Sequence, residues 1–497
     1  MKILIIQLAR LGDIYQTWPI ARALRRTAEA RAETIQIDLL IRERFSEAAL
    51  GLKEVNQVFK LNSREILSPV ICDQPNVQES IEVLDSFVKE LKEQAYDRII
   101  NLSFSAFSSY LTAALGQETT QVNGYSRYAD GFLNLSDDVS SYFLAQVGVG
   151  LFNRVHITEL FAQVAGVELV TADWLGQPSR SPVTKGAHST IHIGASQAKK
   201  TLSPNTWQAL IAHLLKNCSH EIYLIGSKDE MPLAAQISLQ DPLMKARVKN
   251  RVGQTNLSEV MSLVAESKLL IGGDSAPTHI AALTGTPVFN LSFSNVNFWE
   301  TGPKSAGSRI FCLRSEAEIS VAATAYEILA QLRDEPSSAE NLILVKSANE
   351  LYETVRAVKN SVGWELVQAI YMGGDFPPAN DAIFKQALMR LYEVNELALE
   401  QIASLIRNPK NQAAAEIFEH CDLIFKGIEK LSPEAAVLVR WLRSEKLRIG
   451  PDDATAILTN FQNLHLSLER ILRVYPLDIW YQLKNGVLND KNILDEA

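Results

Sequence analysis

The feature that most constrains the fold is an alternation of buried strands and helices that begins at the first residues. Ile3 to Leu8 is a continuous apolar run, and a loop with Gly12 leads from it to a helix expected from about Thr17 to Arg31. A strand that is apolar at every position is typical of a parallel sheet covered on both faces. Further strands are predicted at 35–41, 55–61 and 98–102, with a crossover helix at 78–94. The sequence therefore predicts a doubly wound α/β domain.

A second α/β pattern follows a segment rich in breakers. Residues 177–186 read Gln-Pro-Ser-Arg-Ser-Pro-Val-Thr-Lys-Gly, which is typical of an interdomain linker. Beyond it, strands are predicted at 190–193, 221–225, 269–272 and 287–291, and helices at 204–216, 257–265 and 278–284. Two such domains leave a cleft that faces the carboxyl ends of both sheets, where open α/β sheets bind ligands.

The strand pattern ends after about Ser337. Residues 348–360, 381–398, 411–431 and 453–474 have helical spacing, and no fixed repeat period is evident. Their apolar positions favour the core of a helical bundle over a cofactor site. We predict three domains: residues 1–176, residues 187–336 and an all-helical extension at 337–497.

Composition excludes several classes of protein. The 497 residues are too many for one hydrophobic core, and the formal net charge of −9 disfavours nucleic acid as a partner. The four cysteines form no C-x-x-C pair and the eight histidines are scattered, so we predict no metal site and a reducing compartment. Apolar stretches are too short for a signal peptide or a bilayer span, so we expect a cytoplasmic protein that could touch the inner membrane peripherally.

Three loops could carry chemistry. The first, Leu8 to Ile14, contains Gly12 for a close backbone approach and then Asp13. A carboxylate at the carboxyl end of a strand could accept a proton from a hydroxyl nucleophile. Asp13 could equally well only cap the helix that follows.

The second loop, residues 193–200, follows a strand and carries Ser196 and two lysines ahead of a helix capped by Ser203. Backbone N–H groups, a hydroxyl and a cation suit a diphosphate. An ordinary surface loop with solvated lysines is the alternative.

The third loop, residues 272–278, opens a helix after another strand. Asp274 could bind sugar hydroxyls, and the helix start could bind phosphate. The alternative is that Asp274 or Ser275 is only a cap and that His279 is a satisfied buried imidazole.

The segments "ILIIQLARLGDIYQTWPIARALRR", "IHIGASQAKKTLSPNTW", "YLIGSKDE" and "IGGDSAPTHIAALTGTPVFNL" together resemble glycosyltransferase family 9, which contains the lipopolysaccharide heptosyltransferases. The resemblance covers residues 1–336 and leaves the extension outside. It implies a GT-B fold, with two Rossmann-like domains facing a cleft, and an inverting, metal-independent enzyme without a cofactor. The amino-terminal domain would hold the acceptor and the second domain the nucleotide sugar.

The resemblance also implies roles for individual residues. Asp13 matches the general base, and Lys200, seven residues before Trp207, matches a cation that holds the donor phosphates and acts in catalysis. Glu230 matches an acidic residue for the ribose hydroxyls, and Asp274 the carboxylate that faces the transferred sugar. Arg10 and Gly12 lie on the acceptor side. The donor-binding residues implied in this way are Ser196, Lys200, Gly226, Glu230, Thr255, Asp274, Ser275, Ala276, Pro277, Thr278 and His279.

Three departures from the family pattern leave the identity of the donor open. Ala276 stands where the family usually has glycine, Phe293-Ser294-Asn295 replaces a Gly-Pro-Thr type of loop, and Ala9-Arg10 replaces a small polar pair. ADP-heptose is therefore the default donor. A GT-B nucleotide-sugar epimerase and a non-catalytic scaffold that binds a partner through residues 337–497 are the alternatives.

The identity of the acceptor is the part of the function that the sequence reveals least. A glycan, a glycolipid such as the lipopolysaccharide core, or a protein would each fit. Basic residues of the first domain could meet an anionic glycolipid, or the first three could form a solvated helix face: Arg22, Arg25, Arg26, Arg42 and Arg44. The extension could bind a protein partner, mediate oligomerisation or brace the other domains.

Overall fold

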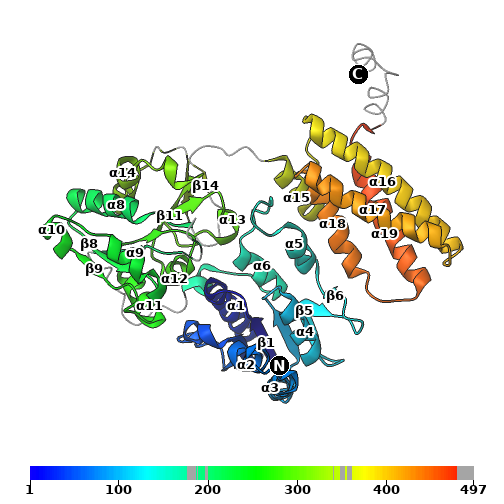
Figure 1. The fold of residues 1–497 in the computed structure, drawn as a ribbon, viewed down its shortest axis with the longest axis horizontal. Coiled ribbons are helices and arrows are strands. Elements are labelled where there is room, and N and C mark those ends of the chain that lie inside the picture. The colour runs from blue at the N-terminus through cyan, green and yellow to red at the C-terminus, as the bar shows by residue number, and fades with distance from the viewer. Residues whose placement is uncertain are drawn as a thin grey trace, which may run out of the picture. The chain divides into compact units, whose positions relative to one another are not determined.

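The computed structural model describes residues 1–175, 186, 188–195, 197, 200–337, 339, 341–346, 353–354 and 361–477 (Figure 1). Its contacts divide the chain into two compact units. The first contains residues 1–124, 148–150 and 154–358, and the second contains residues 125–147, 151–153 and 359–497. The expected linker at 177–186 lies outside the described residues except for Gly186, and the predicted domain boundaries stay predictions.

The first sheet has the parallel strands that the sequence predicts. Its order is β3-β2-β1-β4-β5, and each neighbouring pair is parallel. The strands are β1 (Lys2–Gln7), β2 (Gln36–Arg42), β3 (Gln57–Leu61), β4 (Arg98–Asn101) and β5 (Gln121–Arg127). The helices of this region are α1 (Leu11–Ala30), α2 (Ser63–Ile71), α3 (Val77–Lys92) and α4 (Ala106–Leu115), together with the 3-10 helix η1 (Glu43–Ala49). Buried apolar residues of β1, β2 and β4 form its core.

Helix α1 starts at Leu11, six residues before the start that we predicted at Thr17. Pro19 therefore lies inside the helix, although proline is best tolerated in a first turn. Ile14, Tyr15 and Trp18 are buried on this segment. Their burial outweighs the backbone hydrogen bond that proline removes.

The second sheet is larger than predicted. Its order is β14-β13-β12-β11-β10-β7-β8-β9, parallel from β12 to β9 and antiparallel at β13 and β14. The strands are β7 (His188–His192), β8 (Glu221–Ile225), β9 (Val248–Asn250), β10 (Leu269–Gly272), β11 (Val288–Phe293), β12 (Ser308–Leu313), β13 (Leu342–Val345) and β14 (Glu353–Thr354). The two doubly wound sheets that we predicted are confirmed.

Helices cover this sheet around a core that includes the fully buried Trp207. They are α8 (Pro204–Asn217), α9 (Met231–Gln236), α10 (Pro242–Ala246), α11 (Leu257–Glu266), α12 (Ala276–Thr284), α13 (Phe298–Thr301) and α14 (Val321–Leu332), with the 3-10 helices η3 (Lys228–Glu230) and η4 (Glu316–Glu318).

Strands β13 and β14 correct the prediction that the chain is all helical from residue 337. Residues Leu342 to Val345 are four apolar residues that pair antiparallel with β12. Pairing satisfies backbone groups that an open edge of β12 would expose. The helix expected at 348–360 lies outside the described residues except for β14, and the helical region begins at α15 (Val362–Met372).

Arginines of α1 bind backbone carbonyls and carboxylates within the first unit. Arg22 Nη1 donates to the carbonyl oxygen of Trp174 at 2.6 Å, and Arg26 pairs with Asp173 at 2.9 Å. Both partners lie in α7 (Thr171–Leu175), which together with α6 (Ile157–Val164) packs on α1. Arg25 donates to the carbonyl oxygens of Ile35 and Glu54. These three arginines therefore contribute to packing within the first unit, a role that the sequence analysis did not include. Their contact with an anionic glycolipid stays a prediction.

The second unit consists of a helical bundle and a short β segment. Helices α16 (Ala382–Arg407), α17 (Gln412–Leu431), α18 (Ala435–Arg448) and α19 (Ala454–Leu472) pack on one another (Figure 1). The end of β5 pairs antiparallel with β6 (Leu133–Leu135), and α5 (Asp138–Gln146) packs on α18. Gln146 Nε2 donates to the carbonyl oxygen of Val437 at 3.2 Å. The predicted helical region is confirmed, and residues 125–147 belong with it. In the part of the chain that the structure describes, no helix has the length and apolar character needed to cross a bilayer.

The bundle contains a buried histidine whose protonation opposes folding. His465 Nδ1 lies 2.7 Å from Asn395 Oδ1, and its Nε2 is buried without a hydrogen-bond partner among the described residues. Burial lowers the pKa of His465 from 6.5 to about 3. The folded state therefore holds the neutral ring while the unfolded chain takes up a proton below pH 6.5.

We predict that this pKa shift makes the second unit less stable in acid. The contribution of His465 is complete above pH 6.5 and is lost as pH falls toward 3, by about 1.4 kcal/mol for each pH unit. Thermal unfolding at pH 7.5 and pH 5 of the wild type and of His465→Gln measures it. The variant should lose less stability between these two pH values than the wild type, and equal losses would contradict the prediction.

Candidate functional site

Both sheets bring their candidate residues to a topological switch point. In the first sheet the chain passes from β1 to β2 on one side and from β4 to β5 on the other, so the loops after β1 and β4 open at the carboxyl edge. In the second sheet β7 leads to β8 on one side and β10 to β11 on the other. Ligands of open α/β sheets bind in such crevices. Asp13 follows β1, Lys200 follows β7, and Asp274 follows β10.

Asp13 lies in the first turn of α1. Its Oδ2 accepts a hydrogen bond of 2.8 Å from the backbone N–H of Arg10, so the capping role is real. Burial nevertheless raises the pKa of Asp13, and the charge of Asp274 raises it further, against the lowering effects of the Arg10 hydrogen bond and charge. Asp13 is therefore both a cap and a carboxylate with increased proton affinity.

Helix α1 meets α12 through Gly12, Gln16 and His279. A Cβ atom on Gly12 would lie 2.8 Å from His279 Cδ2, so only glycine permits this approach. Gln16 Nε2 lies 3.0 Å from His279 Nδ1 and 3.1 Å from its Nε2. Burial lowers the pKa of His279 to about 4, so its ring is neutral at pH 7. The sequence did not single out Gln16, which lies one turn after Asp13 on the same helix face.

Lys200 and Asp274 form an ion pair at the switch point of the second sheet. Lys200 Nζ donates to Asp274 Oδ2 at 3.1 Å, and the Lys200 side chain is nearly buried. A Cβ atom on Gly273 would lie 2.6 Å from the carbonyl oxygen of Lys200, so glycine allows the two loops to pack closely. The structure thus brings together the lysine and the aspartate that we predicted. Ser196 lies outside the described residues.

Glu230 occupies a space that two glycines leave open. Cβ atoms on Gly194 and Gly226 would lie 1.6 Å and 2.7 Å from its carboxylate oxygens. Its Oε2 accepts a hydrogen bond of 2.6 Å from the backbone N–H of Ser227. The carboxylate therefore lies at the ends of β7 and β8, and Gly226 is needed for room rather than for a turn.

His192 is a residue of this site that the sequence analysis missed. Its Nε2 lies 3.8 Å from Glu230 Oε2, and its Nδ1 is hydrogen-bonded to Ser275 Oγ at 2.9 Å. Burial lowers the pKa of His192 although the Glu230 charge raises it. Its position in the sequence could have identified it, because His192 is the last residue of a strand that leads into a predicted phosphate-binding loop.

The start of α12 offers few donors. Pro277 has no N–H group, and Thr278 donates its N–H to the carbonyl oxygen of Ser275 and its hydroxyl to that of Gly273. Ser275 Oγ is shared with His192. Ala276, in the first helical turn, keeps a backbone N–H of the kind that helices leave unpaired.

Two further polar side chains lie after β9 and β11. Thr255 Oγ1 and both amide atoms of Asn295 are buried and have no hydrogen-bond partner among the described residues. Buried polar atoms normally have partners, so both side chains are candidates for ligand contact. Asn295 belongs to the loop in which the sequence departs from the family pattern.

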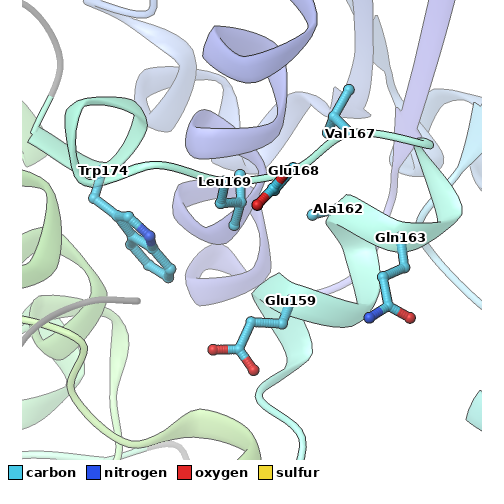
Figure 2. A pocket seen from close by; sticks show the side chains of 7 residues that line it. All are labelled: Glu159, Ala162, Gln163, Val167, Glu168, Leu169 and Trp174. Atoms are coloured by element: carbon cyan, nitrogen blue, oxygen red, sulfur yellow. The ribbon is translucent and has the colours of Figure 1, made fainter. Parts of the chain in front are cut away.

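A separate cavity of about 300 Å³ lies elsewhere in the first unit (Figure 2). Glu159, Ala162 and Gln163 come from α6, and Trp174 comes from α7. The Glu159 carboxylate also accepts a bond of 2.7 Å from Lys304. This cavity contains none of the predicted site residues. Within the described ranges no group of three or more histidine, cysteine, aspartate or glutamate side chains is placed to hold a metal ion.

Comparisons with known proteins agree with this arrangement. The profile of "Glycosyltransferase family 9 (heptosyltransferase)" matches residues 84–327. The chain is 22% identical to "Lipopolysaccharide heptosyltransferase 3" of Escherichia coli over 350 residues, which is 66% of this chain and 97% of the relative. The match to the profile does not include the Asp13 loop, whereas the match to the relative spans nearly all of that protein.

Solved structures give the fold. A glycosyl transferase family 9 structure from Veillonella parvula is similar with a TM-score of 0.50 and 16% identity, covering 67% of this chain and 98% of that one. The "E. coli heptosyltransferase WaaC with ADP" is similar with a TM-score of 0.49 and 16% identity, covering 67% and 100%. The expected GT-B fold is confirmed. The resemblance to glycosyltransferase family 9 that the sequence indicates is confirmed by the match over residues 84–327, and the protein is a glycosyltransferase.

Proposed function

We propose that this protein transfers a sugar from a nucleotide diphosphate to an acceptor hydroxyl with inversion at the anomeric carbon. The observation that carries the proposal is the approach of α1 to α12, which brings the carboxyl of Asp13 within electrostatic range of Asp274, beside Lys200. A base and a cation in one site suit a displacement, because one accepts a proton while the other meets the leaving group.

The proposed step is a single displacement. Asp13 takes the proton of the acceptor hydroxyl while its oxygen forms a bond to the anomeric carbon. The bond from that carbon to the diphosphate oxygen breaks, and its electron pair leaves with the nucleotide diphosphate. Attack on the face opposite the leaving group inverts the configuration.

The raised pKa of Asp13 supports its role as the base. A carboxylate with greater proton affinity removes a hydroxyl proton more readily, provided that it is ionised at the working pH. The hydrogen bond from the Arg10 N–H holds the carboxylate in place without neutralising it.

On the donor side, Lys200 would exchange its partner. In the structure its ammonium group neutralises Asp274. A diphosphate would compete for the ammonium group, and Asp274 would then be able to accept hydrogen bonds from the sugar. Glu230, in its glycine-lined space, would accept the ribose hydroxyls, and the Ala276 N–H, Ser196 and Thr255 would complete the donor contacts.

ADP-heptose, the default that the family resemblance implies, is the donor that we propose, and a relative named as a heptosyltransferase supports the heptose part. The acceptor that we propose is a lipopolysaccharide core glycolipid at the cytoplasmic face of the inner membrane, following the name of the Escherichia coli relative. In this mechanism Lys200 would stabilise the charge of the leaving diphosphate, so that transfer would need neither a metal ion nor a cofactor.

Asp13→Asn should abolish transfer while leaving donor binding nearly unchanged. Loss of the base should lower kcat by roughly 10²–10⁴-fold, because the amide keeps the shape but accepts no proton. The test measures turnover of ADP-heptose and calorimetric donor binding. Asp85→Asn, an exposed site on α3, is the control. Substantial turnover by Asp13→Asn would refute the assignment of the base.

The pH profile of kcat/KM should have an acidic limb above the ordinary carboxyl range. A base with a raised pKa is protonated, and therefore inactive, at pH values where a solvated aspartate would still be ionised. Activity should thus fall as pH decreases through a midpoint above 3.8. An acidic limb at or below that value would contradict the assignment.

Lys200→Ala should lower kcat by roughly 10²–10³-fold, because the leaving diphosphate loses a preorganised cation. Donor affinity should fall as well. Lys245→Ala, an exposed site on α10, is the matched control. A steady-state assay that finds both variants equally active would exclude a role for Lys200 in transfer.

A further inference from the structure

The second unit contains a charged cavity that no part of the proposed transfer uses. Its volume is about 480 Å³, within the roughly 300–1,000 Å³ of small-molecule sites. It lies among β6, α5, α17 and α18, and it is lined by Leu133, Leu144, Ala145, Asp422, Lys426, Glu429, Arg440, Arg443, Ser444, Lys446 and Leu447.

Helical spacing puts the polar lining on facing helices. Asp422, Lys426 and Glu429 are four and three residues apart on α17, so they share one face. Arg440, Arg443, Ser444 and Leu447 have the same spacing on α18. The segment from β6 to α5 adds apolar side chains. The cavity therefore has two charged walls and one apolar wall.

Positive charge is in excess in this cavity. Four cations face two carboxylates, although the chain as a whole has a net charge of −9. Glu429 pairs with Arg440 at 2.7 Å and with Arg443 at 3.3 Å, and Asp422 pairs with Lys446 at 2.6 Å. Lys426 has no ion pair with any residue that the structure describes. Two positive charges therefore remain uncompensated.

The ion pairs hold the cations in place, and the cations keep further N–H groups that can donate hydrogen bonds to a ligand. Glu429 accepts one hydrogen bond from Arg440 Nε and one from Arg443 Nη1. Each guanidinium group carries five N–H groups, so both arginines have more donors than Glu429 uses. Lys446 Nζ lies 4.9 Å from the ring centroid of Phe418, which fixes it from a second side. Arginine forks of this kind match the oxygens of phosphate and carboxylate groups.

We propose that this cavity binds an anionic sugar, with its phosphoryl or carboxyl group on Lys426, Arg440 and Arg443. The sugar ring would pack on Leu133, Leu144 and Leu447, with Ser444 as a hydroxyl partner. The sugar part of this assignment rests on the proposed function, and the anionic part rests on the cavity alone. The helical region would thus contribute recognition of an acidic saccharide.

Calorimetry with the full-length protein tests this. The probes are glucose 6-phosphate, glucuronate and neutral glucose, of which the first two distinguish phosphoryl from carboxyl recognition. We expect at least one anionic sugar to bind and glucose to bind at least tenfold more weakly. Lys426→Ala, which disturbs no ion pair described above, should weaken binding roughly tenfold, and the Lys426→Ala/Arg443→Ala double variant more.

Two controls separate this site from others. Lys430→Ala with Arg407→Ala removes the same charge from exposed positions outside the cavity and should not change binding. Lys200→Ala should not change it either, because that residue belongs to the donor site. Unfolding temperatures check that each variant is folded.

Three results would overturn the proposal: no binding of either anionic sugar, equal affinity in the wild type and the folded Lys426→Ala/Arg443→Ala variant, or loss of binding in Lys200→Ala alone. Failure of the transferase proposal would appear separately, as full turnover by Asp13→Asn with this binding intact.

Discussion

The candidate site depends on the close approach of α1 and α12. Gly12 has no side chain, so the His279 ring can lie against the backbone of α1. That approach brings two carboxyl groups, Asp13 and Asp274, toward one another. Burial and the nearby charge of Asp274 raise the proton affinity of Asp13. Asp274 itself forms an ion pair with the ammonium group of Lys200. The base and the cation therefore have different environments, which lets one accept a proton and the other meet a phosphate.

Much of this was predictable because it lies in local patterns. Continuous apolar runs predicted the parallel strands β1, β4 and β10, and a glycine after such a strand predicted a loop at the carboxyl edge of the sheet. The strand–loop–helix pattern placed Lys200 and Asp274 in such loops, and the family resemblance added Glu230. The pairing of Lys200 with Asp274 and the room that Gly194 and Gly226 leave for Glu230 follow from strand order, which brings distant segments together.

The misses have physical causes. Helix α1 begins earlier than the predicted start at Thr17, since burial of apolar side chains outweighs the hydrogen bond that Pro19 removes. Strands β13 and β14 are too short to show a period, and their pairing with β12 is a tertiary effect. His192 has no motif of its own, and its role follows from Glu230 and Ser275 on either side. That α5 packs on α18 could not be predicted, because nothing local in the sequence reveals a contact between segments so far apart in the chain.

The central claim is that the charge of Asp274 acts on the buried carboxyl group of Asp13. Carbon-13 NMR titration of carboxyl-labelled aspartate in the wild type and in Asp274→Asn, with the Asp13 signal assigned from Asp13→Asn, measures it directly. The account predicts a pKa of Asp13 above 3.8 in the wild type and a lower one in Asp274→Asn. An Asp13 titration that is the same in both proteins would contradict it.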